Sequence, residues 1–263
     1  MVRYDAARCM HPLVVISYNN HVYLENTLRQ ARRFGLSAFI VDNASDYEQT
    51  RTFLETLEPD AEVIRLPHNV GYTSWTRPEI YDRLPDRFFL TDPDLQWNPS
   101  LPADFTRQLD EISLAYSAQR VGFALDLSDH TAMFQDADYH NGQSIHTWER
   151  HFWNRRLTSS AHEIYDAPID TTFHLFDKTK PHGMQIRVAG NFTAKHLPWY
   201  RESQISAHDR MHMYVPSRMS TTAKLVLREM IATGALTTAL DECRGLCSSP
   251  IIESVHDIQR RVR

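Results

Sequence analysis

The sequence predicts an α/β protein whose central sheet is mostly parallel and flanked by helices. Short runs of β-branched and other apolar residues, typical of buried strands, recur along the first half of the chain. Segments with apolar residues at helical spacing separate these runs, and several runs end in Asn or Asp. Strands that alternate with helices are typical of βαβ units, in which consecutive strands lie parallel.

The first such unit is predicted between residues 12 and 41. A strand over residues 12–18 (PLVVISY) ends at Asn19-Asn20, and Asn is a residue type that caps helices. Apolar side chains then recur at helical spacing, so a helix follows (Tyr23, Leu24, Leu28 and Ala31). The run over residues 36–41 (LSAFIV) predicts the second strand, which ends at Asp42-Asn43.

The next elements lead to the strongest motif of the sequence. Asp46 and Gln49 have the spacing of a capping box, which predicts a second helix. A strand over residues 61–66 and a loop over residues 67–71 (PHNVG) come next. The strand over residues 87–91 then runs directly into Asp92-Pro93-Asp94.

The second half of the chain is less regular. It predicts a helix over residues 102–116 and a strand over residues 121–127. Residues 128–170 show little periodicity, which is typical of a long functional loop region, with one short helix around residues 148–153. Two strands, over residues 171–176 and 185–188, extend the sheet. From residue 221 onward two helical segments are separated by Cys247-Ser248-Ser249-Pro250.

Composition excludes several classes of protein. Of the 263 residues, 42% are hydrophobic and 23% are charged, which excludes the disordered and fibrous classes. A net charge of −5, from 28 Lys and Arg against 33 Asp and Glu, argues against a nucleic-acid partner, because such proteins carry a basic face.

The number of cysteines and the hydropathy pattern predict the cellular compartment of the protein. Cys9, Cys243 and Cys247 are too few for a disulfide framework, and none of their spacings is that of a C-x-x-C redox or zinc site. We find no signal pattern, and no apolar run near the ~20 residues that span a bilayer. We therefore expect a cytoplasmic protein, and a peripheral association with the inner face of the membrane is compatible with this expectation.

Asp92 and Asp94 form a candidate metal site. In an extended chain, residues i and i+2 point the same way, and Pro93 favours the extended conformation of Asp92. Paired carboxylates suit Mg²⁺ or Mn²⁺ that bridges a diphosphate. The alternative is a solvated turn. Three strand ends, at Ser17-Tyr18-Asn19, Asp42-Asn43 and Asp92, should converge at the carboxyl edge, where open α/β sheets bind ligands.

Four segments carry a family resemblance: VVISYNN at 14–20, VDNAS at 41–45, HNVGY at 68–72 and FFLTDPDL at 88–95. In this order they resemble the family 2-like glycosyltransferases of the GT-A fold, over roughly the first half of the chain. The resemblance implies a GT-A-type, Rossmann-like fold. It also implies transfer of a sugar from a UDP-, GDP- or dTDP-sugar to a saccharide or glycolipid acceptor, in polysaccharide or glycolipid synthesis.

The resemblance assigns donor residues one by one. Ser17, Tyr18 and Asn19 would line the nucleotide base and ribose, where Asp42 would accept a hydrogen bond. Asn69 and Gly71 would shape the loop against the nucleotide-sugar, although a tight turn alone would also explain them.

The same resemblance assigns the metal. Asp92 and Asp94 match the D-x-D motif that holds Mn²⁺ or Mg²⁺ and the diphosphate. His196 is in the position of a further metal ligand, although a histidine packed beside Trp199 is an equal interpretation.

The catalytic base stays open between two carboxylates. The chain lacks the family's acidic pair of the E-D type and its Q-x-x-R-W motif. Asp170, at the start of the strand over residues 171–176, is the first choice, with a capping role as the alternative. Glu149, between Trp148 and Trp153, is the acceptor-side candidate, with an exposed helix position as the alternative. Whether the reaction inverts or retains configuration is equally open.

We expect a catalytic domain over residues 1–217, with a nucleotide-sugar-binding half (1–118) and an acceptor-side half (119–217), and a helical extension over 218–263. The competing function is a non-catalytic, GT-A-like nucleotide-binding or scaffold protein. A dehalogenase-type phosphatase fits poorly, because Leu95-Gln96 follows the aspartates here and the motif ends the fourth strand. A nucleotidyltransferase needs an N-terminal glycine-rich loop, and no such loop or P-loop is present.

Overall fold

The structure, a computed structural model, describes residues 11–57, 61–136, 138–159, 161–217, 220–243, 251, 253–255 and 257–258. Contacts divide the chain into two compact units. We call them the sheet unit (Met1–Ser128 and Glu149–His196) and the helical unit (Asp129–Trp148 and Leu197–Arg263). The expected division at residues 217 and 218 stays a prediction, because it concerns which parts fold and act on their own.

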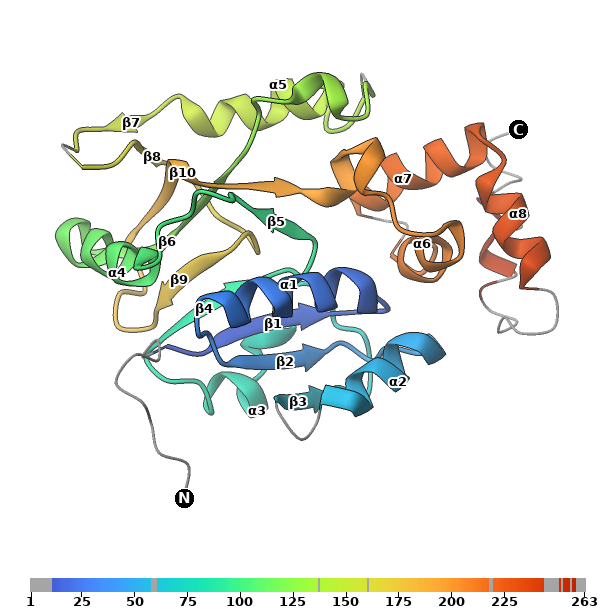
Figure 1. The fold of residues 1–263 in the computed structure, drawn as a ribbon, viewed down its shortest axis with the longest axis horizontal. Coiled ribbons are helices and arrows are strands. Elements are labelled where there is room, and N and C mark those ends of the chain that lie inside the picture. Colours follow the sequence, from blue (N-terminus) through green and yellow to red (C-terminus); the bar gives the residue numbers. More distant parts are fainter. Residues whose placement is uncertain are drawn as a thin grey trace. The chain divides into compact units, whose positions relative to one another are not determined.

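The sheet unit is built on a 10-stranded sheet in the described part of the chain, in the order β3-β2-β1-β4-β9-β6-β10-β8-β7, with β5 paired to β10 (Figure 1). The first four strands in this order are parallel, β9 is antiparallel to both neighbours, and β6 and β10 are parallel. The strands are β1 Leu13–Ser17, β2 Ala38–Asp42, β3 Glu62–Arg65, β4 Arg87–Thr91, β5 Leu95–Trp97, β6 Ala118–Leu125, β7 Arg156–Leu157, β8 Ile164–Asp166, β9 His174–Asp177 and β10 Met184–His196.

Helices flank this sheet, so the predicted α/β class with a mostly parallel sheet is confirmed. The helices and 3₁₀ turns up to residue 153 are α1 His21–Arg33, α2 Glu48–Leu57, η1 Ser74–Thr76, α3 Pro78–Tyr81, α4 Phe105–Tyr116, η2 His130–Ala132, α5 Ile145–Arg150 and η3 His151–Trp153. Those after residue 196 are η4 Leu197–Trp199, η5 Arg201–Ser203, α6 Ala207–Tyr214, α7 Thr221–Ala232 and α8 Ala235–Glu242.

The alternation of side chains along the strands explains the core. Neighbours in β4 point to opposite faces of the sheet, so Phe88 and Phe89 enter different clusters. Phe88 packs with Trp75 and Ile80 on the face that η1 and α3 cover. Phe89 stacks on Phe173 at 5.2 Å between ring centroids, in an aromatic cluster that includes Trp97, Phe105 and Phe123.

The insertion of β9 between β4 and β6 requires a glycine. A Cβ atom at Gly122 would lie 2.2 Å from the Phe173 carbonyl oxygen and 2.4 Å from the His174 Cβ. These contacts are shorter than van der Waals distances, so Gly122 lets β9 approach β6. Sequence analysis did not predict that an antiparallel strand, β9, lies between β4 and β6 in the sheet.

Several boundaries differ from the predicted ones. The strand expected over residues 185–188 extends to His196, and the strand expected over residues 171–176 begins only at His174. The helix expected to be capped by Asp46 begins at Glu48, and the Asp46 carboxylate accepts a hydrogen bond from the Asn19 side chain. The helix α6 was not predicted, and the link expected over residues 247–250 lies outside the described residues.

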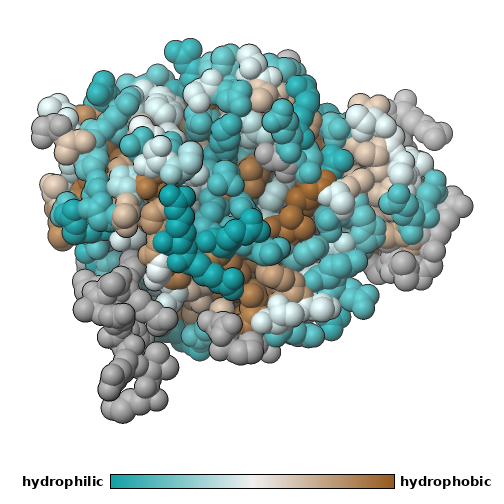
Figure 2. Space-filling view, viewed as in Figure 1, coloured by the Kyte–Doolittle hydropathy of each residue, from teal (hydrophilic) through white to brown (hydrophobic). Residues whose placement is uncertain are grey.

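The visible face of the molecule is mostly hydrophilic, with apolar side chains in a few small areas (Figure 2). In the described residues, every helix is too short or too polar to cross a bilayer.

Candidate functional site

The carboxyl ends of β1, β2 and β4 bring most of the predicted donor residues to one edge of the sheet. Ser17 pairs with Asp42 in the parallel register of β1 and β2, and Val15 pairs with Thr91 in that of β1 and β4. Asp92 directly follows Thr91. The convergence expected from the strand order is therefore observed, as a consequence of parallel pairing.

Helix α1 holds the segment that carries the two aspartates. The Thr27 hydroxyl donates to the Pro93 carbonyl oxygen at 2.5 Å. The Gln30 side chain donates to the Leu95 carbonyl oxygen at 2.9 Å and accepts from the Trp97 N–H at 2.7 Å. These three bonds fix the backbone between β4 and the end of β5, so the carboxylates sit on a rigid support rather than on a mobile turn.

The pairing of β5 with β10 places His196 beside Asp94. Leu95 and His196 are partners in the antiparallel register, and the His196 Nε2 lies 3.4 Å from the Asp94 Oδ2. Asp94 is only 8% exposed, and its Oδ1 has no hydrogen-bond partner among the described residues. A buried carboxylate oxygen without a donor carries an uncompensated desolvation cost.

The negative charge of Asp94 acts on the neighbouring carboxyl group of Asp92. Burial, and then the negative charge of Asp94, raise the pKa of the Asp92 carboxyl well above its usual range. The Thr171 hydroxyl donates to the Asp92 carboxylate and opposes this rise. A cation beside Asp92 would favour its ionised form, against the effect of burial and of the Asp94 charge.

Asp170 belongs to the same group of charges. Its Oδ1 accepts from the backbone N–H of Thr171 at 2.7 Å and from that of Thr172 at 3.4 Å. Desolvation raises the pKa of Asp170, but the charge of Arg187, these two N–H groups and the charge of His196 outweigh it, so the pKa is lowered. Asp170 precedes β9 by four positions, so backbone hydrogen bonds rather than the predicted strand fix its position.

Glu149 is not the exposed helix residue of the alternative interpretation. It is 2% exposed, and its carboxylate accepts a hydrogen bond from the Arg187 guanidinium. Burial raises the pKa of Glu149 to about 7, while Arg187 lowers it and Asp170 raises it. The carboxylate therefore binds the guanidinium and is withdrawn from solvent.

Arg187 is the charged residue that sequence analysis missed. It is 4% exposed, its Nε donates to the Pro168 carbonyl oxygen at 2.9 Å, and its guanidinium lies 4.1 Å from the Phe152 ring centroid. The sequence does contain an indication of it, because Arg187 lies between the apolar residues Ile186 and Val188 in a predicted strand. Buried charges are rare unless they are paired, so an arginine within a predicted buried strand indicates a buried acidic partner.

A second group of side chains lies at the ends of β1 and β2. Asp42 is 2% exposed, and its Oδ1 accepts from the Ser45 hydroxyl at 2.5 Å. Burial raises the pKa of Asp42, and its bonds to Ser45 oppose the rise. Burial, then the charge of Asp46, raise the pKa of Tyr18 to about 12, and a hydrogen bond with Asn69 opposes this.

Asparagines shape the loops around this group. The Asn19 side chain accepts from the N–H groups of Asp46 and Tyr47, both at 3.0 Å. The Asn43 side chain donates to the Asn69 side chain at 2.8 Å and to the Gly71 carbonyl oxygen at 2.9 Å. Asn19 and Asn43 thus hold the segments that carry the other candidates.

Two further residues assigned to the donor site, Gly71 and Ser17, lie in a loop and at the end of β1. Gly71 has φ +80°, and a Cβ there would meet no atom within 4 Å, so backbone conformation rather than close packing explains the glycine. Ser17 is 1% exposed at the end of β1.

Solved structures show only weak similarity to this chain. No protein-family model and no curated protein match the sequence. A mannosyltransferase from Pyrobaculum calidifontis, solved with GDP-Man and Mn²⁺, is 14% identical over 96% of this chain and 80% of that one, with a TM-score of 0.45. HddC from Yersinia pseudotuberculosis, complexed with GMP-PN, is 12% identical over 70% of this chain and 92% of that one, with a TM-score of 0.42.

A third solved structure, 4-diphosphocytidyl-2C-methyl-D-erythritol synthase from Anaerococcus prevotii, is 13% identical over 64% of this chain and 72% of that one, with a TM-score of 0.33. The fold is therefore described from the structure itself. The mostly parallel sheet with helices on its faces, and with polar side chains at its carboxyl edge, is the GT-A-type, Rossmann-like arrangement expected for this chain.

Proposed function

We propose that this protein is a metal-dependent glycosyltransferase that moves a sugar from a nucleotide diphosphate-sugar to an acceptor hydroxyl. The observation that carries the proposal is the pair Asp92 and Asp94. One of their oxygens, Asp94 Oδ1, is buried without a hydrogen-bond donor in the described residues, and Asp94 helps to raise the pKa of Asp92. A divalent cation would give the Asp94 oxygen a partner and would favour the ionised form of Asp92. Hard carboxylate oxygens suit Mn²⁺ or Mg²⁺.

The residues present fit such an ion. Asp92 and Asp94 would hold it, with the His196 imidazole, 3.4 Å from Asp94, as the third ligand. When bound, the ion would neutralise negative charge on the diphosphate leaving group. The aspartates lie on backbone fixed by Thr27 and Gln30, so the site needs little rearrangement.

The donor nucleotide would bind at the ends of β1 and β2. Asp42 would accept a hydrogen bond from the base or ribose, next to Ser17 and Tyr18. The loop with Asn69 and Gly71, which Asn43 holds, would border the nucleotide-sugar. The residues assigned to the donor thus lie on one sheet edge with the assigned metal ligands.

Asp170 is the proposed base for an inverting reaction. Its lowered pKa keeps the carboxylate ionised at neutral pH, and its side chain is exposed and able to reach an acceptor hydroxyl. Glu149 is enclosed with Arg187, so we now give it the supporting role of positioning that guanidinium. A saccharide or glycolipid, at the cytoplasmic side of a membrane, remains the proposed acceptor class.

A donor panel tests the proposal. UDP-, GDP- and dTDP-sugars are each added with Mn²⁺, with Mg²⁺ or with chelator, and thermal stability and donor hydrolysis are measured. One nucleotide class should raise the melting temperature and be hydrolysed slowly, only when metal is present. Asp94→Asn should remove both effects, whereas the exposed Glu111→Gln should remove neither.

Two outcomes would count against this function. Stabilisation by a nucleotide-sugar, with no hydrolysis and no transfer to any acceptor, would favour the non-catalytic binding protein. No response to any nucleotide or metal would refute the donor site as a whole.

A further inference from the structure

The helical unit has its own core, formed by α6, α7 and α8. Met211 and Val215 of the α6 segment are fully buried against Val226 and Met230 of α7 and Leu236 of α8. The Arg210 guanidinium also donates to the Glu229 carboxylate at 2.7 Å, which ties α6 to α7. Side chains on these helices are therefore held on a packed support.

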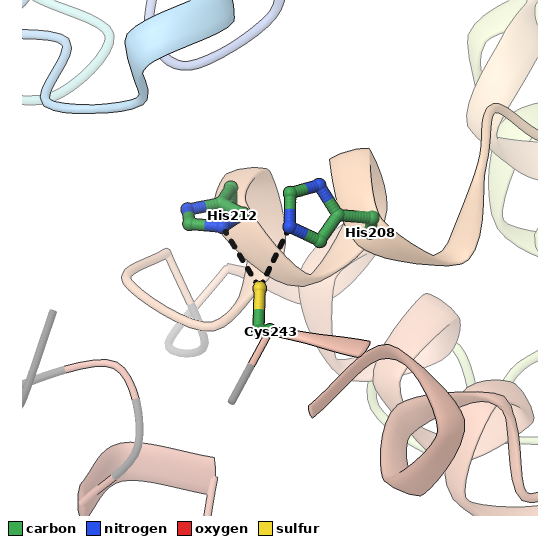
Figure 3. Close-up of side chains that lie close together, drawn as sticks. All are labelled: His208, His212 and Cys243. Atoms are coloured by element: carbon green, nitrogen blue, oxygen red, sulfur yellow. Dashed lines mark hydrogen bonds between the residues drawn. The ribbon is translucent and has the colours of Figure 1, made fainter. Parts of the chain in front are cut away.

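Three side chains of residue types that can ligate metals, those of His208, His212 and Cys243, lie close together in this unit (Figure 3). His208 and His212 are four residues apart on α6 and so lie on one face of the helix. Cys243, the residue that caps the end of α8, points between their rings. Its Sγ lies 2.7 Å from the His208 Nε2 and 3.8 Å from the His212 Nε2.

The distances suit a common ligand. Around a tetrahedral Zn²⁺ ion, Zn–N bonds of about 2.0–2.1 Å and a Zn–S bond of about 2.3 Å place nitrogen and sulfur roughly 3.5 Å apart. The two observed separations lie on either side of this value, and the three ligand atoms are all within 4.8 Å of one another.

Burial and donor type favour zinc over other cations. Cys243 is 1% exposed and His212 is 7% exposed, so water is largely excluded from these two ligands, while His208 is partly buried. Imidazole nitrogen and thiolate sulfur are borderline and soft donors, which Zn²⁺ accepts and which Mg²⁺ and Ca²⁺ do not prefer. The site shares no residue with the carboxylates of the sheet unit.

We propose that His208, His212 and Cys243 bind a structural Zn²⁺ ion that joins α6 to the end of α8. A water molecule or one further side chain would complete a tetrahedral shell. Cys243 is disulfide-bonded in the structure, and only the reduced residue supplies a thiolate, so the proposal concerns the reduced protein.

The test measures metal in the full chain kept under a non-chelating reductant. Elemental analysis of the dialysed protein should give about one zinc per chain. After removal of zinc, titration with Co²⁺ should produce a sulfur-to-cobalt charge-transfer band and the strong visible bands of a tetrahedral ion. Cys243→Ser should abolish the charge-transfer band, and His212→Ala should weaken Zn²⁺ binding by at least ~10-fold, since even outer-shell changes at zinc sites cost that much.

A second histidine pair in the same unit supplies the control. The rings of His130 and His146 lie 4.6 Å apart between centroids. His130→Ala should therefore keep one zinc and the full cobalt spectrum.

Three results would overturn the site. The first is reduced wild-type protein that binds no stoichiometric Zn²⁺ and shows no sulfur-to-cobalt band, a result that needs no variant to fold. The second is a charge-transfer band that persists in Cys243→Ser. The third is equal Zn²⁺ affinity in the disulfide-oxidised protein, because the proposed ligand is a thiolate.

Discussion

The positive charge of Arg187 acts on both Asp170 and Glu149, yet the pKa values of these two carboxyl groups shift in opposite directions. Arg187 and two backbone N–H groups lower the pKa of Asp170 against desolvation, whereas burial raises the pKa of Glu149 to about 7. The lowered pKa keeps the Asp170 carboxylate ionised at neutral pH, whereas burial disfavours ionisation of the Glu149 carboxyl group. This difference separates a candidate proton acceptor from a residue that supports it.

We predict that Asp170→Asn lowers the rate of sugar transfer by roughly 10²–10⁴-fold, the usual contribution of a positioned general base. The amide keeps the shape of the side chain but cannot accept the proton. Affinity for the nucleoside diphosphate, measured by calorimetry, should stay nearly unchanged. Asp166→Asn, which alters the exposed ion pair with Arg155, should leave transfer intact.

Two outcomes would change this assignment. Loss of nucleotide affinity in Asp170→Asn would make Asp170 a donor-site residue. Normal transfer in that variant, together with lost transfer in Glu149→Gln, would give the base role to Glu149.

His174 should make the protein sensitive to acid. It is fully buried, its Nδ1 lies 2.6 Å from the Thr172 carbonyl oxygen, and desolvation, then the charge of Arg120, lower its pKa from 6.5 to about 3. Between these values the unfolded chain binds a proton that the folded protein does not. The unfolding free energy should therefore fall as the pH drops from 6.5 towards 3, by about 1.4 kcal/mol per pH unit from this group.

Urea unfolding over this pH range checks the prediction. His174→Phe removes the titrating group, so its unfolding free energy should depend less steeply on pH than that of the wild type. Parallel pH profiles for the two proteins would show that His174 does not titrate in this way.

At the scale of elements, β10 and α5 are joined by the buried pair of Arg187 and Glu149. We predict that Glu149→Ala lowers the unfolding free energy by about 3–5 kcal/mol, because it leaves the guanidinium buried without its carboxylate. Asp166→Ala removes a partner of Arg155, whose side chain is 77% exposed, and should cost at most about 1 kcal/mol. Equal effects in chemical denaturation would argue that the Arg187 pair is not enclosed.

The contact of β6 with β9 yields a further prediction at this scale. Gly122→Ala should destabilise the protein severely, since the new Cβ would meet the backbone of Phe173 at 2.2 Å. Gly190→Ala, in open space at φ +64°, should cost only about 1–2 kcal/mol of conformational strain. If thermal unfolding gave Gly122→Ala the smaller loss, the close approach of the strands would be wrong.

At the scale of the whole molecule, local patterns predicted the parallel half of the sheet well. The strand predicted over residues 87–91 has the same boundaries as β4 in the structure. The prediction was accurate because an apolar run suited to a strand ends at Asp92-Pro93. β10 was predicted too short because Gly190-Asn191 looks like the end of a strand. The chain instead shifts register between Val188 and Thr193 and continues to His196.

Long-range relations explain the rest of what sequence analysis missed. The pair of Arg187 and Glu149 joins residues 38 positions apart, and no local pattern shows such a contact. The place of β9 between β4 and β6 likewise depends on Gly122, which in the sequence is a single glycine within an apolar run. The roles assigned to the metal ligands and to the donor residues remain predictions, which the distances between these side chains allow to be tested residue by residue.

The central claim is that Asp92 and Asp94 bind a metal that is required for nucleotide binding. Isothermal titration calorimetry of UDP, GDP and dTDP, with Mn²⁺ and with chelator, tests it most directly. We predict that one nucleotide binds with Mn²⁺, that chelation abolishes binding, and that Asp94→Ala does the same at an unchanged melting temperature of the unliganded protein. Unchanged affinity after chelation, or normal Mn²⁺-dependent binding by Asp94→Ala, would contradict the claim.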